Sequence, residues 1–342
     1  MTTAILLISE QTLPNVLFLK QFGPFDRFVF LTTERMEREG RSDWIIKSAR
    51  LFEGDVTRLK IDPENANLSL KSLEQFPWPK AEQYWINLTG GTKMMALAAF
   101  SFFAGKPGCR VVYLPINSSV FLEIHPEPQE LPLEVNVSLE EYLSAYGAVI
   151  QSQDANWMPY AGRARQVMDT VLKKGGPDAD KKILSWLDPE GRDELSAEDK
   201  KFYSGQWFEI WLAWAIHYHL GIPETDIRVE VKLNRIGVAP GTSFEYDVMF
   251  VKNSRLYVAE CKYFPGDHFQ VGKINKELFK FASMNAQLGL FARPFFAIGN
   301  KISQPAQQHA LHGQCDILRL KYPADITVLS TPNAFVAFMN SL

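Results

Sequence analysis

The sequence has few cysteines, no long apolar run and almost no net charge, and each shortage excludes a class of protein. Only three of its 342 residues are cysteines, Cys109, Cys261 and Cys315, and no two form a C-x-x-C pair. This spacing argues against a disulfide framework and favours a reducing, cytoplasmic location. No run approaches 18 apolar residues, and residues 1–14 lack a basic segment, so we expect neither a membrane span nor a signal peptide.

The small net charge limits what composition says about nucleic-acid binding. A formal charge of −3 excludes a protein dominated by one large basic surface, although the last third of the chain is mildly basic. There, Lys273, Lys276 and Lys280 fall on one side of a predicted helix, where they contact either a nucleic-acid backbone or solvent. Hydrophobic residues make up 46% of the chain, enough for more than one core, and the length predicts two or three domains.

Residues 1–125 alternate between short apolar runs and helical patterns. We expect helices at residues 15–22, 36–50, 68–76 and 92–104, and apolar strands at residues 4–8, 28–31, 84–88, 110–114 and 120–124. Strands that are apolar throughout are typical of a parallel sheet with helices on both faces. The prolines at 126, 128 and 132 then indicate a domain boundary.

The rest of the chain changes character twice. Residues 136–200 are polar in part and begin with Ser138 three residues before Glu141, the spacing of a helix-capping box, so we expect a small helical linker. Residues 201–342 predict a second α/β domain, with a helix that ends at Gly221, strands at 243–251 and 256–264, a helix at 271–288 and a strand at 295–298. The expected domains are therefore 1–135, 136–200 and 201–342.

The most informative chemistry lies on the strands expected at 243–251 and 256–264. A polar turn joins them, and pairing Val251 with Leu256 places Asp247 opposite Glu260, with Lys262 on the same face as Glu260. Opposed Cβ atoms are about 5 Å apart, so the two carboxylates repel unless a positive charge lies between them. Because both faces are otherwise apolar, we expect a partly buried Mg²⁺ or Mn²⁺ site rather than a surface salt bridge.

Glu209 is the other candidate ligand of this site. It is the only charged residue in the apolar stretch 207–216, where helical spacing places it on one side with Leu212 and Ile216. A lone carboxylate on a buried helix needs a partner, and a metal ion would be one. The alternative is a helix edge at which Glu209 reaches water.

A second constellation, Asn87-Leu-Thr-Gly-Gly-Thr-Lys93, follows an expected strand and opens an expected helix. Gly90 and Gly91 permit a tight turn, and free N–H groups at a helix N-terminus attract anions. Lys93 in the first turn opposes the helix dipole, which indicates an anionic ligand. The spacing fits neither a Walker A motif nor G-x-G-x-x-G, and on spacing alone a plain turn with a solvated lysine is an equal alternative.

Glu209, Asp247 and Glu260-Cys261-Lys262 together resemble the PD-(D/E)xK nuclease motif, with Tyr246 in place of the proline. With the Thr-Gly-Gly-Thr-Lys turn and the domain order, the whole chain resembles the CRISPR-associated Rossmann-fold (CARF) nucleases of type III systems. The resemblance implies that this turn and nearby loops bind a cyclic oligoadenylate, cyclic tetra-adenylate (cA4) in particular. The residues at these positions are Ser9, Gln11, Thr12, Asn15, Thr32, Thr33, Thr89, Gly90, Gly91, Thr92, Lys93 and Asn117.

The resemblance also implies a homodimer and a metal-dependent endonuclease. Asp247, Glu260 and Glu209 would bind Mn²⁺ or Mg²⁺, and Lys262 would assist the attacking water, in the cleavage of single-stranded DNA or RNA and the nicking of supercoiled DNA. The expected fold is thus α/β, with a Rossmann-like CARF domain, a helical linker and a restriction-endonuclease-like domain. Two alternatives stay open: a non-catalytic nucleotide sensor that binds nucleic acid, and a DNase that needs no cyclic nucleotide.

Overall fold

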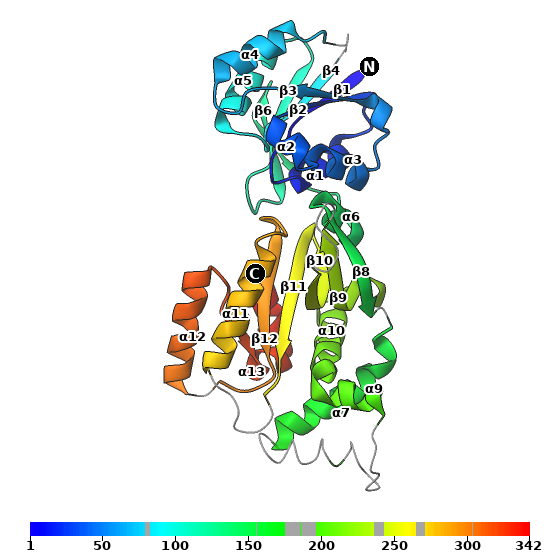
Figure 1. Ribbon diagram of the computed structural model, residues 1–342, viewed down its shortest axis with the longest axis vertical. Helices are drawn as coiled ribbons and strands as arrows, with labels where there is room; N and C mark the ends of the chain where they lie inside the picture. The colour runs from blue at the N-terminus through cyan, green and yellow to red at the C-terminus, as the bar shows by residue number, and fades with distance from the viewer. Residues whose placement is uncertain are drawn as a thin grey trace. The chain divides into compact units, whose positions relative to one another are not determined.

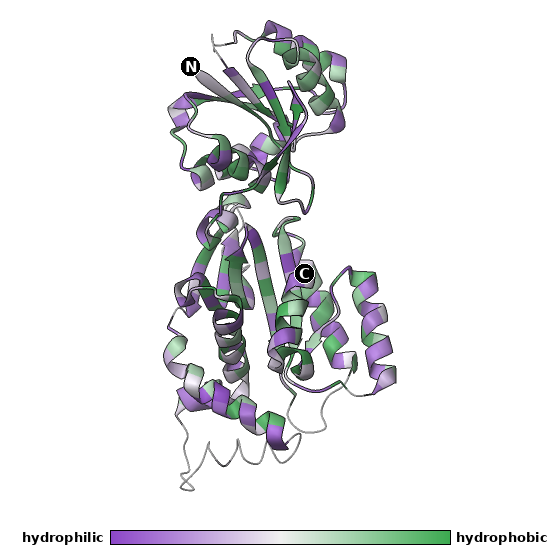
Figure 2. Ribbon diagram, turned by 180° about the vertical axis from the view of Figure 1, so that it is seen from behind, coloured by the Kyte–Doolittle hydropathy of each residue, from purple (hydrophilic) through white to green (hydrophobic). Residues whose placement is uncertain are grey.

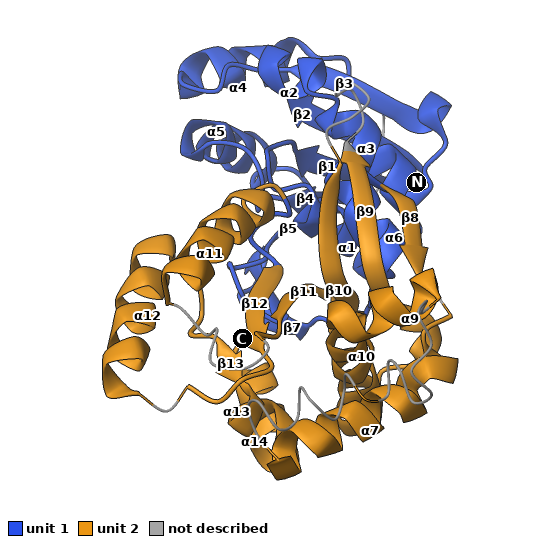
Figure 3. Cartoon of the chain, turned by 60° about the horizontal axis from the view of Figure 1, so that its bottom comes forward, with its two compact units in different colours: residues 1–149, 235–237, 288–291 blue, residues 150–234, 238–287, 292–342 orange. Residues whose placement is uncertain are grey.

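The computed structural model describes residues 1–78, 83–154, 156–174, 185, 196–235, 243–264, 271–302 and 304–342. Within these ranges the chain divides into two compact units (Figure 3). Unit 1 contains Met1–Val149 together with Arg235 and the short segment Leu288–Phe291, and unit 2 contains the remaining residues. Each unit is built on its own sheet flanked by helices (Figure 1), so the expected α/β class is confirmed.

The sheet of unit 1 has, within the described ranges, seven strands in the order β3-β2-β1-β4-β5-β6-β7. Its first five strands are parallel, and β6 and β7 extend it in an antiparallel manner. Most residues of the central strands are buried, as their apolar sequences predict. The strands are β1 (Thr2–Leu7), β2 (Arg27–Thr32), β3 (Val56–Lys60), β4 (Gln83–Asn87), β5 (Cys109–Tyr113), β6 (Val120–His125) and β7 (Gln129–Pro132).

Helices cover both faces of this sheet (Figure 1). Two of them, α4 and α5, pack on the face that carries Ile5, Leu7 and Ile86, while α1 and α3 lie against the other face. The helices of unit 1 are α1 (Leu13–Phe22), α2 (Glu34–Arg38), α3 (Arg41–Ala49), α4 (Ala66–Gln75), α5 (Lys93–Phe103) and α6 (Leu139–Ala145). Alternation of strand and helix therefore gives the Rossmann-like layering that the sequence predicts.

Three parts of unit 1 differ from the expectation, and one of them is the edge strand β7 (Gln129–Pro132), which forms where only a proline-containing connection is expected. The helix expected at residues 36–50 is two helices, α2 and α3, because the chain turns at Gly40, whose φ of 75° is left-handed. The expectation also lacks β3, whose sequence Val-Thr-Arg-Leu-Lys is half polar. This strand lies at the edge of the sheet and is partly exposed, so it does not carry the apolar signal of a central strand.

Unit 2 holds a mixed sheet whose described strands run in the order β13-β12-β11-β10-β9-β8. Antiparallel pairs join β9, β10 and β11, whereas β11, β12 and β13 are parallel. The strands are β8 (Ala148–Asp154), β9 (Ile227–Arg235), β10 (Phe244–Lys252), β11 (Arg255–Lys262), β12 (Ala292–Ile298) and β13 (Ala324–Asp325). The helices are α7 (Met158–Lys174), α9 (Ala197–Lys201), α10 (Trp207–Leu220), α11 (Val271–Asn285), α12 (Pro305–Leu318), α13 (Ile326–Ser330) and α14 (Pro332–Ser341).

The main core of unit 2 lies between the sheet and α10. Trp207, Phe208 and Leu212 of this helix are fully buried against α7 and the strands, and apolar residues run along the strands of the sheet (Figure 2). The helix ends where expected, at Gly221 in a left-handed conformation. Although α10 is apolar on nearly all sides, none of the helices in the described ranges is both long and apolar enough to span a membrane.

The region expected as a helical linker, residues 136–200, is shared between the two units. In unit 1, α6 begins with the expected capping box of Ser138 and Glu141. In unit 2, β8 forms the edge of the sheet and α7 packs on α10. The described part of this region thus contributes a strand and helices to the two neighbouring cores, and the domain boundaries at 135 and 200 stay a prediction.

The capping box gives a direct test of the first unit. Ser138→Ala should lower the free energy of unfolding by about 1 kcal/mol, because Ser138 Oγ accepts the Glu141 N–H at 3.1 Å and Glu141 accepts the Ser138 N–H at 2.9 Å. The matched control is Ser144→Ala in the same helix, whose hydroxyl is buried with no hydrogen-bond partner among the described residues. Urea denaturation should find the control neutral or slightly stabilised, and equal losses would contradict the assignment.

Candidate functional sites

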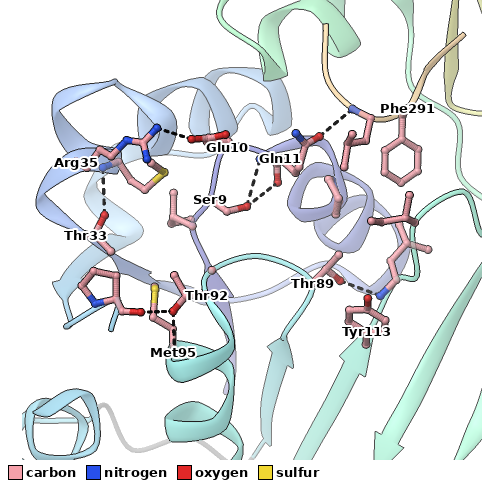
Figure 4. A pocket seen from close by; sticks show the side chains of 18 of the residues that line it. Ser9, Glu10, Gln11, Thr33, Arg35, Thr89, Thr92, Met95, Tyr113 and Phe291 are labelled. Atoms are coloured by element: carbon pink, nitrogen blue, oxygen red, sulfur yellow. Dashed lines mark hydrogen bonds and ion pairs between the residues drawn. The ribbon is translucent and has the colours of Figure 1, made fainter. Parts of the chain in front are cut away.

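A cavity of about 770 Å³ opens at the carboxyl edge of the sheet of unit 1 (Figure 4). Its walls are the loops that follow β1, β2 and β4, the position at which open α/β sheets bind ligands. Hydroxyl, amide and charged side chains alternate with apolar ones around it. The polar lining residues are Ser9, Glu10, Gln11, Thr33, Arg35, Glu64, Thr89, Thr92 and Tyr113.

Asn87, at the end of β4, shapes the loop that leads into α5. Its side-chain oxygen accepts the backbone N–H of Thr89 at 3.1 Å and the Thr89 hydroxyl at 2.6 Å. Its amide nitrogen donates to Asn15 Oδ1 at 2.8 Å, so the loops after β1 and β4 are fixed to each other. Both asparagines are fully buried, where a missing partner would cost about 1–3 kcal/mol.

The two glycines of this loop are required by the close approach of β1. A Cβ atom at Gly90 would lie 1.9 Å from the carbonyl oxygen of Leu7, which no side chain permits. Gly91 has a φ of 73°, in the left-handed region that glycine favours. The backbone therefore passes directly over the end of β1, and Gly91 forms part of the cavity wall.

Threonine side chains cap the helices that begin at the cavity. Thr92 Oγ1 accepts the Met95 N–H at 3.3 Å at the start of α5 and donates to the carbonyl of Pro63, while Thr33 Oγ1 accepts the Met36 N–H at 3.2 Å at the start of α2. Figure 4 shows Thr33 and Thr92 on the same side of the cavity. The positive ends of these helices thus point toward the space that a ligand would fill.

Six of the twelve residues expected to bind the ligand line the cavity: Ser9, Gln11, Thr33, Thr89, Gly91 and Thr92. The other six are outside its lining: Thr12, Asn15, Thr32, Gly90, Lys93 and Asn117. Thr12, Asn15 and Thr32 are fully buried, and their side chains bond to Ala145, Leu7 and Glu37. These three residues hold the loops in shape, whereas Lys93 is exposed on the first turn of α5.

The sequence analysis missed part of the lining. Arg35 lies two residues after Thr33 and bonds to Glu10 and Glu39, so the loop after β2 could have included it. By contrast, Leu290 and Phe291 come from a segment about 200 residues farther along the chain. No local pattern marks them, because only the tertiary structure brings this segment to unit 1.

In unit 2, the hairpin of β10 and β11 has the expected register, with Val251 opposite Leu256 and Val248 opposite Ala259. Asp247 and Glu260 follow at the next position. Both carboxylates approach the same ammonium group, since Lys262 Nζ lies 2.6 Å from Glu260 Oε1 and 3.9 Å from Asp247 Oδ2. The positive charge that offsets the repulsion between the two carboxylates is therefore the ammonium of Lys262.

The backbone and the sheet fix the position of Asp247 further. Asp247 Oδ2 accepts the backbone N–H of Cys261 at 2.6 Å. Cys261 faces the core beneath α10, while Glu260 points to the other side of the strand. Asp247 thus lies at the end of the antiparallel ladder, between the lysine and the backbone of β11.

Burial strongly raises the pKa of two of these acids, Glu209 and Asp247. Burial and then repulsion by Asp247 raise the pKa of Glu209 to about 9, and burial followed by repulsion from Glu260 raises that of Asp247 to about 7. Although burial opposes its charge, Lys262 has a pKa above the usual range because Asp247 and Glu260 stabilise the ammonium. Asp247, Glu260 and Lys262 all influence Glu209, so the structure gathers the four predicted residues into one electrostatic cluster.

Glu230 is a further acid of this cluster that the sequence analysis missed. It lies on β9 between Val231, opposite Tyr246, and Val229, opposite Val248, so the register places it opposite Asp247, and its φ is 51°. Its carboxylate bonds to Lys201 Nζ at 2.5 Å and Gln206 Nε2 at 3.2 Å, and it also raises the pKa of Glu209.

The donor chemistry of the cluster suits a divalent cation. Glu209, Asp247 and Glu260 offer oxygen ligands, and Glu209 Oε2 is buried with no hydrogen-bond partner among the described residues. As they stand, however, no three His, Cys, Asp or Glu side chains in the described ranges are grouped around one point as metal ligands. The carboxylates are thus chemically suited to Mg²⁺ or Mn²⁺, although one oxygen of Glu260 forms an ion pair with Lys262.

Comparison with known families identifies the first unit. Residues 3–142 match the family described as the Card1 CARF domain. The N-terminal domain is a CARF domain. This confirms the Rossmann-like CARF domain expected from the sequence, and all the residues that line the cavity described above belong to it except Leu290 and Phe291. No curated protein matches the chain.

Solved structures share the fold of the whole chain. Can2 from Sulfobacillus thermosulfidooxidans, solved in complex with cyclic tetra-adenylate, is 20% identical, with a TM-score of 0.73 over 98% of this chain and 99% of that one. Protein VC1899 from Vibrio cholerae is 14% identical, with a TM-score of 0.75 over 99% of this chain and 97% of that one. A type III CRISPR defence DNA nuclease activated by cyclic oligoadenylate is 18% identical, with a TM-score of 0.54 over 87% of this chain and 45% of that one. The CARF domain is thus followed by a second α/β domain in a shared arrangement of folds.

The raised pKa of Glu209 predicts how stability depends on pH. The native state keeps this proton up to about pH 9, whereas the unfolded chain releases it near pH 4, so Glu209 lowers the stability of the metal-free protein as pH rises between these values. Glu209→Gln should therefore be more stable than the wild type at pH 8 by more than about 1 kcal/mol. Urea denaturation with a chelator should show the two proteins converging at pH 4, and an equal difference at both pH values would contradict this.

Proposed function

We propose that the chain is a metal-dependent endonuclease of type III CRISPR defence that a cyclic oligoadenylate activates through the CARF domain. The observation that carries the proposal is the convergence of Asp247 and Glu260 on Lys262 beside the unpartnered oxygen of Glu209. Buried ionisable clusters of this kind are typical of catalytic sites. Can2, which shares the fold over its full length, was solved with cyclic tetra-adenylate.

The cavity of the CARF domain is the proposed ligand site. Its hydroxyl groups and the N-termini of α2 and α5 suit the phosphates and riboses of a cyclic oligoadenylate. Its volume of about 770 Å³ is in the range of single small-molecule sites, so it suits part of a tetranucleotide ring rather than the whole.

A homodimer would complete this site. A ring with two-fold symmetry fits on the axis between two copies, each of which supplies one cavity. Met94 and Leu97 on α5, together with Tyr113 and Ile116, are large apolar side chains exposed on this domain, and such side chains favour a protein partner. A cytoplasmic location belongs to the same proposal, since the three cysteines are free thiols.

The nuclease chemistry would be performed by the acid cluster of unit 2. Glu209, Asp247 and Glu260 would hold Mn²⁺ or Mg²⁺, which activates water and stabilises negative charge on a phosphodiester. The ammonium of Lys262 lies within the cluster, where low dielectric strengthens its attraction to a phosphate oxygen. The backbone N–H of Cys261 holds the Asp247 carboxylate in a fixed orientation.

The proposed substrate is single-stranded DNA or RNA, and nicking of supercoiled DNA is part of the same activity. Lys273, Lys276 and Lys280 are exposed on α11 and are placed along one side of it, as nucleic-acid backbone contacts require. The runner-up is a non-catalytic sensor, which is favoured by one observation, the ion pair of Lys262 with Glu260 that already neutralises the acid. A DNase that ignores cyclic nucleotides would leave the CARF cavity without a role.

Cleavage by the Glu260→Gln variant tests the catalytic assignment. The variant should lose at least about 100-fold of the activity on single-stranded DNA, RNA and plasmid with Mn²⁺ and cA4, because one charged ligand and the partner of Lys262 are removed. Binding of cA4 should be unchanged. Glu245→Gln, which changes an exposed carboxyl on the neighbouring strand β10, is the matched control and should cut normally.

Two results would overturn the catalytic assignment. If Glu260→Gln cuts like the wild type, the cluster is not the active site. If the wild type cuts nothing and Asp247→Asn leaves Mn²⁺ affinity unchanged, the sensor is the better description.

The exposed lysine of the CARF domain tests the ligand site separately. Lys93→Ala should weaken cA4 binding about tenfold, the usual value of one charge-assisted contact, and leave ligand-independent cutting unchanged. Lys106→Ala, beyond the far end of α5, is the control because its ammonium lies over the ring of Phe102 at 4.1 Å. Calorimetric titration measures both, and equal affinities for wild type and Lys93→Ala would remove Lys93 from the site.

A further inference from the structure

A short piece of chain between α11 and β12 belongs to unit 1, although the chain on either side of it belongs to unit 2. This segment, Leu288–Phe291, lies with the CARF domain, whereas α11 ends at Asn285 and β12 begins at Ala292. The covalent chain thus leaves unit 2, contacts the CARF domain over four residues and returns directly into a strand. Leu290 and Phe291 form part of the cavity wall.

Hydrogen bonds to Tyr142 and Gln11 hold this segment to the rest of unit 1. Tyr142 on α6 donates its hydroxyl to the carbonyl of Leu288 at 2.9 Å. Gln11 Oε1 accepts the backbone N–H of Leu290 at 2.9 Å and the hydroxyl of Tyr146 at 3.1 Å. One side-chain oxygen of the cavity wall therefore holds both the segment and Tyr146, which follows α6. Figure 4 shows the bond from Gln11 to the chain beside Phe291.

The fit around Gly289 shows how closely the segment is held. Gly289 has a φ of 81°, and a Cβ atom there would lie 2.1 Å from Cζ of Tyr146. Glycine is thus required both for the backbone conformation and for the contact with the tyrosine ring. Because Tyr142 and Tyr146 are buried, the segment has few alternative positions while its hydrogen bonds stay intact.

The strand that follows the segment lies beside the acid cluster. β12 pairs in parallel with β11 along its whole length, and Phe296 lies opposite Glu260 and Ile298 opposite Lys262. A strand is nearly inextensible, at about 3.3 Å per residue, so a displacement of Phe291 is passed to Ala292 and on along β12. The hydrogen bonds of β12 are made to the strand that carries two residues of the cluster.

We propose that Gln11 is a positioning residue that couples occupation of the CARF cavity to β12. A ribose-bearing occupant donates a hydroxyl to Gln11 Oε1 in place of the Leu290 N–H, which is then released. Release of Leu288–Phe291 lets β12, and β11 with it, adopt the arrangement in which Lys262 leaves Glu260. The arrangement in which Gln11 holds the segment is the resting state. This inference rests on the proposed function and specifies how the same site is regulated.

Variants that loosen the segment should activate the protein without ligand. Tyr142→Phe removes one hydrogen bond to the segment and does not line the cavity. It should raise ligand-independent cleavage of single-stranded DNA about tenfold, the effect of about 1.4 kcal/mol, and reduce the fold-activation by cA4 correspondingly. Gln11→Leu should have the same effect on ligand-independent cleavage.

Ser48→Ala is the matched control for these variants. The Ser48 hydroxyl donates to the carbonyl of Glu141 on the same helix at 2.7 Å, but it does not contact the segment. This variant should leave ligand-independent cleavage unchanged. If Tyr142→Phe and Gln11→Leu behave like Ser48→Ala, the coupling is wrong.

Hydrogen–deuterium exchange separates the coupling from the ligand site itself. Addition of cA4 to the full-length Glu260→Gln protein should slow exchange at residues 89–95 and speed exchange at residues 288–298 by at least about threefold. Slower exchange at 89–95 with unchanged or slower exchange at 288–298 would overturn the coupling and leave the ligand site intact. No change at 89–95 would overturn the ligand site, and the coupling with it.

Discussion

The mutual repulsion of buried carboxylates is the constraint on which unit 2 depends. The register of the hairpin brings Asp247 and Glu260 together at its end, where both side chains are largely buried. Glu230 adds further negative charge and helps to keep Glu209 protonated, while the ammonium of Lys262 offsets the repulsion between Asp247 and Glu260. Electrostatic strain of this kind lowers stability and raises reactivity, as is common where a fold builds a reactive site.

In the CARF domain, the main constraint is the support of the loops that surround the cavity. Buried side chains provide this support from below, since Asn15 and Asn87 bond to each other under the loops. The hydroxyls of Thr33 and Thr92 satisfy the first turns of their helices. The chain's own hydrogen bonds therefore fix the loops that form the cavity wall.

A short stretch of backbone connects the cavity to the acid cluster. Gln11 bonds to the segment that leads into β12, and β12 is the neighbour of the strand that carries Glu260 and Lys262. A rearrangement in the cavity and a rearrangement of the cluster are thus linked by a covalent path of a few residues. Direct backbone continuity is a simple physical basis for communication between sites, because it needs no chain of side-chain contacts.

Local patterns in the sequence determined most of the elements and the motif residues. The apolar strands, the cap at Ser138, the turn at Gly90 and Gly91 and the pairing of Val251 with Leu256 all follow from spacing, because period, register and helix ends are short-range properties. Tertiary structure alone decided which residues line the cavity and which support it, and it brought Leu290, Phe291 and Glu230 to the two sites. These residues carry no local signal, since their positions depend on contacts between segments far apart in the chain, which only the folded core specifies.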